Sequence, residues 1–366
     1  MAWTRRLPSG RFQGLYRDAT GRTRTTGTFA RKGGASDAAG DEEAGIRKGS
    51  WVDPDHNRLT VAEWAESWLP TKLDMRPSSF ARLEGILATH VLPAFGRVPL
   101  AGVSNLEVRR FVAGMLDKGS SPATARKTYS VLNQMMRAAV ADRRIAFNPC
   151  ADVPLPSAAV AEQRFLSRDE VALLADSIDE RFRALVLLAA YGGLRFGELA
   201  GLRRKRVDVL RARVTVAETL TDVSGVLRFG APKTKRSRRE VPLPRSIVRE
   251  LETHLGRFVG AGADALVFTG PKGAALRRAG FRRSWWHPAV SAAGLEGFKV
   301  HELRHTFVAL WVDAGANVKE VSVRAGHSSV AFTLDHYGHL YQDRSDALAE
   351  RLDDLLDARV GAHGSH

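Results

Sequence analysis

Six polar residues in the second half of the chain could together act on a phosphodiester. They supply two guanidinium groups, one ammonium group, two imidazoles and one phenol, and they are Arg195, Lys233, His301, Arg304, His327 and Tyr337. A planar guanidinium can bind two phosphate oxygens, and a phenol becomes a nucleophile when cations and a base favour loss of its proton. The set therefore predicts a tyrosine that attacks a DNA phosphate.

Arg195 stands between two helical patterns. It follows two glycines that end an apolar helix, and it precedes Phe-Gly-Glu198-Leu near the start of the next one. Its guanidinium fork suits a phosphate, but Glu198, three residues on, could instead hold it in a structural ion pair. Both roles are compatible if Glu198 orients the Arg195 guanidinium while that guanidinium binds the phosphate, and this is the arrangement we expect.

A dense basic segment, 233–239, lies between two candidate strands, so a hairpin tip would carry it to DNA. Most of its cations should contact phosphates without taking part in chemistry, and these are Lys235, Arg236, Arg238 and Arg239. Lys233 is the candidate proton donor, because neighbouring cations lower the pKa of a lysine. Lys235 remains an alternative for that role.

His301 and Arg304 lie three positions apart, so on a helix they share one face. Arg195 and Arg304 could then hold both non-bridging oxygens of a phosphodiester and stabilise the added charge of its pentacoordinate state. His327 follows a glycine, begins another segment and could donate a hydrogen bond to the same phosphate.

Tyr337 is the candidate nucleophile. A phenol with an ordinary pKa of ~10 reacts poorly at neutral pH, but a cluster of cations and an imidazole base would favour the phenolate. Tyr341 could compete for this role. The other three tyrosines fit packing or binding better.

The order of these motifs resembles the tyrosine recombinases, also called phage-type integrases. The resemblance covers roughly 60–350. It is carried by Gly-Leu-Arg195-x-x-Glu198-Leu, by Pro-Lys233-Thr-Lys with Val-Pro-Leu after it, by His301-x-x-Arg304-His-Thr, and by Gly-His327-Ser-Ser followed by Thr-Leu-Asp-x-Tyr337-Gly-His-Leu. One departure concerns spacing: many relatives place the tyrosine nine residues after the histidine, whereas Tyr337 lies ten after His327.

The resemblance implies a reaction in two transesterifications. Tyr337 would attack the scissile phosphate to leave a 3′-phosphotyrosyl bond and a free 5′-hydroxyl, which then attacks the partner strand. Lys233 would be the general acid and His301 would assist proton transfer, with no metal and no other cofactor. The implied partners are double-stranded DNA with attachment-type sites, three further copies of the chain in a homotetramer, and a directionality factor or a host DNA-bending protein.

Three other interpretations compete with this one. His301-Glu-Leu-Arg304-His305 also satisfies the H-E-x-x-H pattern of zinc proteases, although a guanidinium would then lie beside a dication and no third histidine follows. A DNA-binding factor without catalysis could use the same scaffold. A type IB topoisomerase, which shares this chemistry, is the nearest enzymatic alternative.

The bulk composition favours a nucleic acid partner. The chain has 366 residues, a net charge of +15 and a pI near 10.5, and counterion release makes such a cation bind polyanions. The first residues lack an apolar signal segment and no apolar stretch is long enough to span a membrane, so we expect a cytoplasmic, nucleoid-associated protein without a membrane partner. The single cysteine, Cys150, has no partner for chemistry.

The elements that must position the six residues predict a mainly α, multidomain protein. A basic β-hairpin and a helix (35–48) form a small arm-type DNA-binding domain over 1–55, a helical bundle forms a core-binding domain over 59–153, and an α-rich catalytic domain with a small antiparallel β-sheet fills 163–366. In the first two domains we expect DNA contacts from Arg11, Arg22, Arg24, Arg126 and Lys127. Leucines at helical spacing near 345–360 predict a terminal helix, which could pack on its own domain or on a neighbouring copy.

Overall fold

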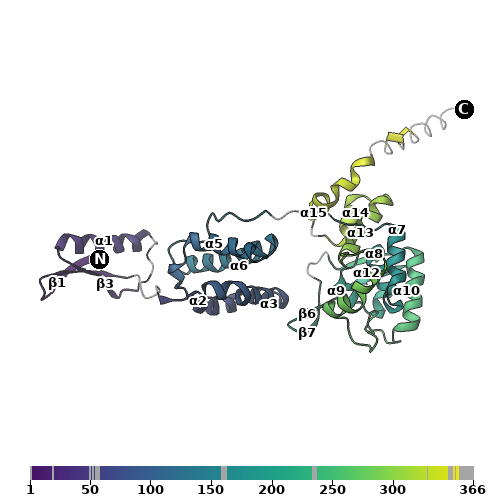
Figure 1. Cartoon of the computed structure of the whole chain (residues 1–366), viewed down its shortest axis with the longest axis horizontal. Coiled ribbons are helices and arrows are strands. Elements are labelled where there is room, and N and C mark those ends of the chain that lie inside the picture. The colour runs from purple at the N-terminus through teal and green to yellow at the C-terminus, as the bar shows by residue number, and fades with distance from the viewer. Residues whose placement is uncertain are drawn as a thin grey trace, which may run out of the picture. The chain divides into compact units, whose positions relative to one another are not determined.

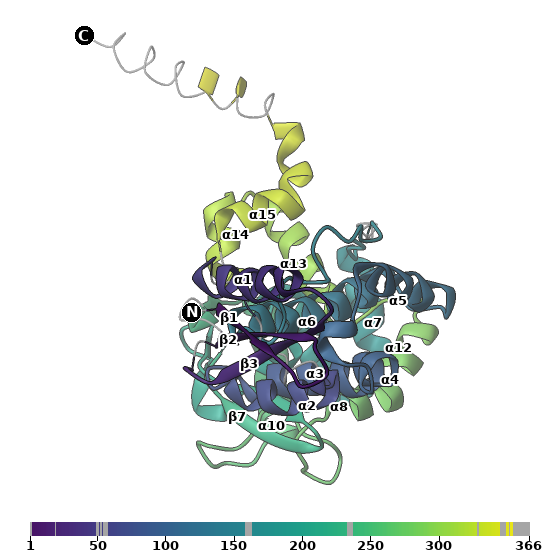
Figure 2. The same cartoon turned by 90° about the vertical axis from the view of Figure 1, so that its left-hand side faces the viewer.

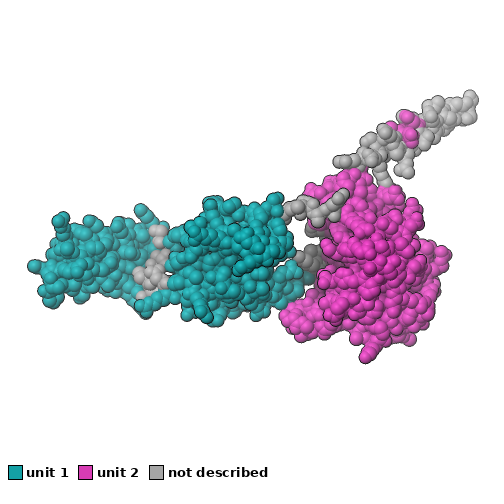
Figure 3. All heavy atoms as spheres, in the orientation of Figure 1, with its two compact units in different colours: residues 1–160 teal, residues 161–366 magenta. Residues whose placement is uncertain are grey.

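The computed structural model describes residues 2–18, 20–48, 51, 53, 58–157, 163–232, 237–327, 329–344, 349–350 and 352–353. It contains two compact units, residues 1–160 and 161–366, each considered by itself (Figure 3). The fold is mainly helical with small sheets, as the sequence predicts. The division of the chain into three domains stays a prediction. Across the described ranges, no helix has the length and apolar character needed to cross a membrane.

The first unit begins with a three-stranded antiparallel sheet, β1 (Ala2–Arg6), β2 (Phe12–Arg17) and β3 (Thr23–Phe29), in the order β1-β2-β3. Helix α1 (Lys32–Lys48) lies across one face of this sheet (Figures 1 and 2). The helix approaches so closely that a Cβ on Gly14 would lie 2.4 Å from the carbonyl oxygen of Ala35. The sequence predicts only the β2–β3 hairpin, and the strand β1 adds to it by pairing with β2.

The rest of the first unit is a helical bundle around one apolar core. Capping boxes at Thr60 with Glu63 and at Ser104 with Glu107 start two of its helices, because each pair satisfies two backbone N–H groups at a helix end. Its elements are α2 (Val61–Trp68), η2 (Leu69–Thr71), α3 (Pro77–Ile86), η3 (Leu87–Val91), α4 (Leu92–Phe95), η4 (Leu100–Gly102), α5 (Asn105–Asp117) and α6 (Pro122–Ala141).

The second unit packs helices around α8 (Glu180–Gly192), which is apolar from residue 184 onward and buried along most of its length. Helices α7 (Arg168–Ser177), α10 (Arg245–Phe258) and α13 (Glu302–Asp313) contact it. The other helical segments are α9 (Phe196–Ala200), η5 (Arg204–Arg206), α11 (Arg278–Phe281), η7 (Arg282–Trp286), α12 (His287–Ala292), α14 (Val318–Ala325), α15 (Val330–Tyr337) and η8 (Gly338–Arg344). Most of the predicted C-terminal helix lies outside the described residues.

Two small antiparallel sheets stand beside these helices. Strands β4 (Val207–Asp208), β5 (Arg213–Val216) and β8 (Arg239–Pro242) form one sheet in the order β4-β5-β8. Strands β6 (Thr219–Val223) and β7 (Val226–Gly230) form a separate hairpin between β5 and β8 in the chain. The segment 233–236 follows that hairpin and lies outside the described residues.

Gly193 ends α8 and starts the turn that leads to Arg195. Its φ of +65° is in the left-handed region, and a Cβ there would lie 2.6 Å from the Phe307 ring. Gly294 has the same backbone conformation, with a φ of +66°, but a Cβ there would meet no atom within 4 Å.

We expect Gly193→Ala to destabilise the protein more than Gly294→Ala does. Both substitutions force a left-handed alanine, at a cost of about 1–2 kcal/mol, whereas only Gly193→Ala adds overpacking of about 1–3 kcal/mol. Chemical denaturation would measure the free energy of unfolding of both variants. Equal losses would show that the packing of Phe307 against Gly193 contributes nothing.

Candidate active site

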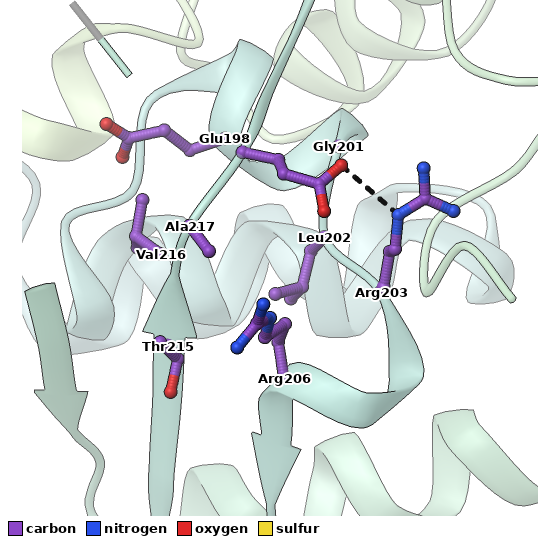
Figure 4. A pocket seen from close by; sticks show the side chains of 9 residues that line it. Glu198, Gly201, Leu202, Arg203, Arg206, Thr215, Val216 and Ala217 are labelled. Carbon is purple, nitrogen blue, oxygen red and sulfur yellow. Dashed lines mark hydrogen bonds and ion pairs between the residues drawn. The ribbon is translucent and has the colours of Figure 1, made fainter. Parts of the chain in front are cut away.

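Arg195 and Glu198 form the predicted ion pair at the start of α9. Glu198 accepts hydrogen bonds from the backbone N of Arg195 at 3.0 Å and from its Nη1 at 2.9 Å. Only 4% of the Glu198 side chain is exposed. Glu198 lines a small cavity together with Arg203 and Arg206, but its carboxylate points away from both arginines (Figure 4). Nη2 of Arg195 donates to the carbonyl oxygen of Gly326 at 3.1 Å, and the Arg195 side chain remains 39% exposed, so the guanidinium is fixed in place and still accessible.

Arg239 is the second cation on Glu198, and it corrects a sequence prediction. We expected Arg239 to contact DNA, but its side chain is 4% exposed and its Nη2 lies 3.0 Å from Glu198 Oε2. Its Nε donates to the carbonyl oxygen of Arg324 at 2.6 Å. Burial alone would raise the pKa of Glu198, but the charge of Arg239 and then that of Arg195 outweigh it and lower that pKa. Arg239 is therefore a structural residue of the site.

Arg304 supplies a buried guanidinium with one arm available. It lies on α13 and is 3% exposed. Its Nη1 donates to the carbonyl oxygen of Gly193 at 2.7 Å, whereas its Nη2 has no hydrogen-bond partner in the part of the chain that the structure describes. Burial, followed by the charges of Arg195 and Arg239, lowers the pKa of Arg304 to about 9, so the group stays charged at neutral pH. A buried cation with an unsatisfied donor is costly unless an anion pairs with it.

Tyr337 ends α15 and is 2% exposed, within an apolar cluster that includes Phe307 and Val321. Its hydroxyl lies 2.5 Å from Nδ1 of His305. Burial raises the pKa of Tyr337 to about 12, although Arg304 opposes the rise. The expectation that surrounding cations favour the phenolate is therefore wrong for the protein without DNA, because desolvation outweighs them.

His305 is the site residue that the sequence prediction missed. It follows Arg304 on α13, and its contact with the Tyr337 hydroxyl makes it the group best placed to accept the phenol proton. The signal was available, because His305 lies four residues after His301 and so on the same side of the helix. Burial lowers the pKa of His305, which keeps its ring neutral and able to accept a proton.

His301 and His327 flank this pair. His301 is exposed at the start of α13, with its ring centroid 5.4 Å from that of His305. His327 is 6% exposed, and its ring stacks on Tyr337 at 5.9 Å with an interplanar angle of 3°. Desolvation, followed by neighbouring positive charges, lowers the pKa of the buried His327 to about 3. The His327 ring is therefore neutral at physiological pH.

His327 makes the stability of the protein without DNA depend on pH. Between its folded pKa of about 3 and the ordinary value of ~6.5, the unfolded chain binds more protons than the folded chain, so stability falls as pH drops through this window. We expect the midpoint of thermal unfolding to decrease from pH 7 to pH 5, and His327→Gln to flatten the decrease. An unchanged pH slope in the variant would contradict the low pKa of His327.

The remaining predicted DNA ligands fall into three groups. Lys233, Lys235 and Arg236 lie outside the described residues. Five side chains are exposed, and their contact with DNA stays a prediction: Arg11, Arg22, Arg126, Lys127 and Arg238. Arg24 is a correction, because its side chain is 18% exposed and its guanidinium pairs with Asp18 and Asp53, each at 2.9 Å, which offsets its charge within the first unit.

The zinc-protease interpretation finds no support in the described ranges, where no group of three His, Cys, Asp or Glu side chains could hold a metal ion. His305, the second histidine of that pattern, instead contacts Tyr337. The His305 ring is therefore the hydrogen-bond partner of a tyrosine hydroxyl.

Comparison with known proteins shows the family of the chain. The model of the phage integrase family matches residues 164–344, and that of the phage integrase central domain matches residues 61–154. The integrase of Mycobacterium phage L5 is 27% identical over 360 residues, which cover 95% of each protein.

Two solved structures share the fold. The Tn1549 transposon integrase in complex with transposon right end DNA aligns with a TM-score of 0.68 and 21% identity, over 81% of this chain and 100% of that chain. A lambda integrase tetramer bound to a Holliday junction aligns with a TM-score of 0.59 and 18% identity, over 94% of this chain and 95% of that chain. The two domain matches, with the relative from phage L5, show that the chain belongs to the phage integrase family, the tyrosine recombinases.

Proposed function

We propose that this chain is a site-specific DNA recombinase that integrates or excises a phage or another mobile element through Tyr337. The observation that carries the proposal is the buried Arg304, whose unpartnered Nη2 lies in the same site as Arg195 and the Tyr337–His305 pair. A scissile phosphate would satisfy that donor. Its charge would also offset the cluster of cations, for which Glu198 is the buried counter-ion among the described residues of the second unit.

The first transesterification follows from this arrangement. Arg195 and Arg304 bind the non-bridging oxygens, and His327 donates a hydrogen bond to one of them. The phenol oxygen of Tyr337 forms a bond to phosphorus while its proton passes to Nδ1 of His305. The bond from phosphorus to the 5′-oxygen breaks, and that oxygen receives a proton from the general acid.

Lys233 is the proposed general acid, with His301 assisting the proton transfer. The assignment of Lys233 rests on the family resemblance and on its place after the β6–β7 hairpin. In the second step, the 5′-hydroxyl of the partner strand gives its proton to Lys233 and attacks phosphorus, the bond from phosphorus to the Tyr337 oxygen breaks, and Tyr337 takes its proton back from His305. One phosphodiester replaces another, so the reaction needs no external energy source.

The proposed substrate is double-stranded DNA with attachment-type sites. The integrases with which this chain aligns come from a mycobacterial phage, a transposon and phage lambda, and the lambda structure is a tetramer on a Holliday junction. We infer that four copies of this chain assemble on two duplexes, with the N-terminal domain binding arm-type DNA. The reaction would take place in the cytoplasm on nucleoid DNA, aided by a directionality factor or a host DNA-bending protein.

The experiment uses the DNA that flanks the gene, where an attachment site is expected. A panel of flanking duplexes, each nicked beside a candidate cleavage position so that the released fragment is lost, is incubated with the full chain. The expected result is a covalent protein–DNA adduct that survives denaturing electrophoresis. Binding to a duplex without any adduct across the panel would favour a DNA-binding factor, and relaxation of supercoiled DNA without strand exchange would favour a topoisomerase.

A further inference from the structure

Thr333 is a buried residue of the site to which neither the sequence prediction nor the proposed mechanism gives a role. It lies on α15, four residues before Tyr337, and its side chain is fully buried. Its Oγ1 lies 2.8 Å from Nδ1 of His327, which is the one hydrogen-bond partner that the described residues offer this hydroxyl.

This contact determines which nitrogen of His327 carries the proton. A buried hydroxyl must donate its hydrogen to an acceptor, and the acceptor within reach is Nδ1 of the ring. In a neutral imidazole, one nitrogen accepts and the other carries the hydrogen. Donation from Thr333 to Nδ1 therefore places the proton of His327 on Nε2.

We propose that Thr333 is a positioning residue that holds His327 in the Nε2–H tautomer, so that the ring donates a hydrogen bond to the scissile phosphate. This inference rests on the proposed function for the role of the phosphate, whereas the tautomer itself is a property of the protein without DNA. The opposite tautomer would present a lone pair to the phosphate oxygen and repel it.

The other contacts of His327 fix where the ring lies but not its tautomer. The ring stacks on Tyr337, and Phe332 meets it edge-on with a centroid distance of 5.0 Å. Its backbone N donates to the carbonyl oxygen of Ser322 at 3.0 Å. None of these contacts distinguishes the two ring nitrogens. The ring is neutral at physiological pH because its pKa is about 3, so the choice between tautomers has to be made by a hydrogen bond.

The test compares Thr333→Val, which removes the hydroxyl and keeps the shape, with Thr333→Ser, which keeps the hydroxyl. On a nicked substrate under single-turnover conditions, Thr333→Val is expected to form the adduct about tenfold more slowly, the effect of losing one well-placed hydrogen bond, with an unchanged Kd for DNA. Thr333→Ser should restore the rate. A wild-type rate in Thr333→Val would overturn the inference.

A double-variant comparison separates this role from a general effect on packing. In a His327→Phe background the tautomer no longer exists, so adding Thr333→Val should slow adduct formation no further. A further tenfold loss there would show that Thr333 acts through something other than His327 and would refute the proposal.

A third measurement stands independently of recombination. Histidine labelled with nitrogen-15 in the full chain without DNA reports by NMR which ring nitrogen is protonated, and His327→Gln identifies the resonance. We expect protonation at Nε2 in the wild type and in Thr333→Ser, and a mixture of tautomers in Thr333→Val. Protonation of His327 at Nδ1 in the wild type would refute the inference even if the adduct forms. Absence of an adduct together with an Nε2–H signal would refute the proposed function alone.

Discussion

Replacing Tyr337 with phenylalanine is expected to abolish the covalent protein–DNA adduct and to leave the Kd for DNA within about twofold. The substitution removes the phenol oxygen that forms the bond to phosphorus, and catalysis through a covalent intermediate cannot proceed without that atom. The ring itself stays in the apolar cluster with Phe307 and still stacks on His327. Adduct formation would be measured on a nicked substrate and DNA binding on the intact duplex.

Tyr341→Phe is the matched control. Tyr341 lies one turn further along the chain in η8, at the edge of the same apolar cluster, so the change in chemistry is identical and the change in position is small. This variant should keep the adduct. An adduct that persists in Tyr337→Phe and disappears in Tyr341→Phe would transfer the role of nucleophile to Tyr341.

Arg239→Gln is expected to lower the free energy of unfolding by about 3 kcal/mol or more, because it removes one partner of a buried ion pair. Glu198 would keep Arg195, whose guanidinium is partly exposed, as its one remaining cation. The carbonyl oxygen of Arg324 would also lose its donor. Chemical denaturation of the full chain at neutral pH would measure the loss.

Arg238→Gln is the control for this prediction. Arg238 is the neighbouring residue and carries the same charge, but its side chain is exposed, so its replacement should change stability by no more than about 0.5 kcal/mol. If Arg238 contacts phosphates, its replacement should weaken DNA binding and reduce the dependence of that binding on salt. Equal loss of stability in the two variants would contradict the structural role of Arg239.

The parts of the fold that depend on residues close together in the sequence could be predicted. The capping boxes at Thr60 and Ser167 and the Ser121-Pro122 start of α6 all begin helices in the structure, because each is a local interaction. Strand β1 was missed because it exists by pairing with β2 and carries no turn or alternation of its own. Its existence depends on tertiary structure.

In the candidate site, too, contacts between residues close in sequence could be predicted and contacts between distant residues could not. The contact of Arg195 with Glu198 spans three residues and could be anticipated, whereas His305 meets Tyr337 across 32 residues of the chain. Cations can be counted in a sequence, but burial of the phenol, which decides the direction of its pKa, cannot. The burial of Arg239 could have been predicted, because it lies two residues before the apolar Val241 on β8 and so points to the same, inward side of the strand.

The insertion of the β6–β7 hairpin between neighbouring strands makes the length of one part of the site adjustable. Strands β5 and β8 pair directly, so the stretch 217–238 leaves the sheet and returns to the same place. Doubling the length of a connection whose two ends are held costs only about 0.6 kcal/mol of closure entropy. Strand β6 packs against α9, so we expect insertions to be tolerated between β7 and β8, as long as Arg239 anchors the start of β8. The reach of the segment that carries Lys233, the proposed general acid, could then change while Arg195, Arg304 and Tyr337, the proposed partners of the phosphate, keep their places.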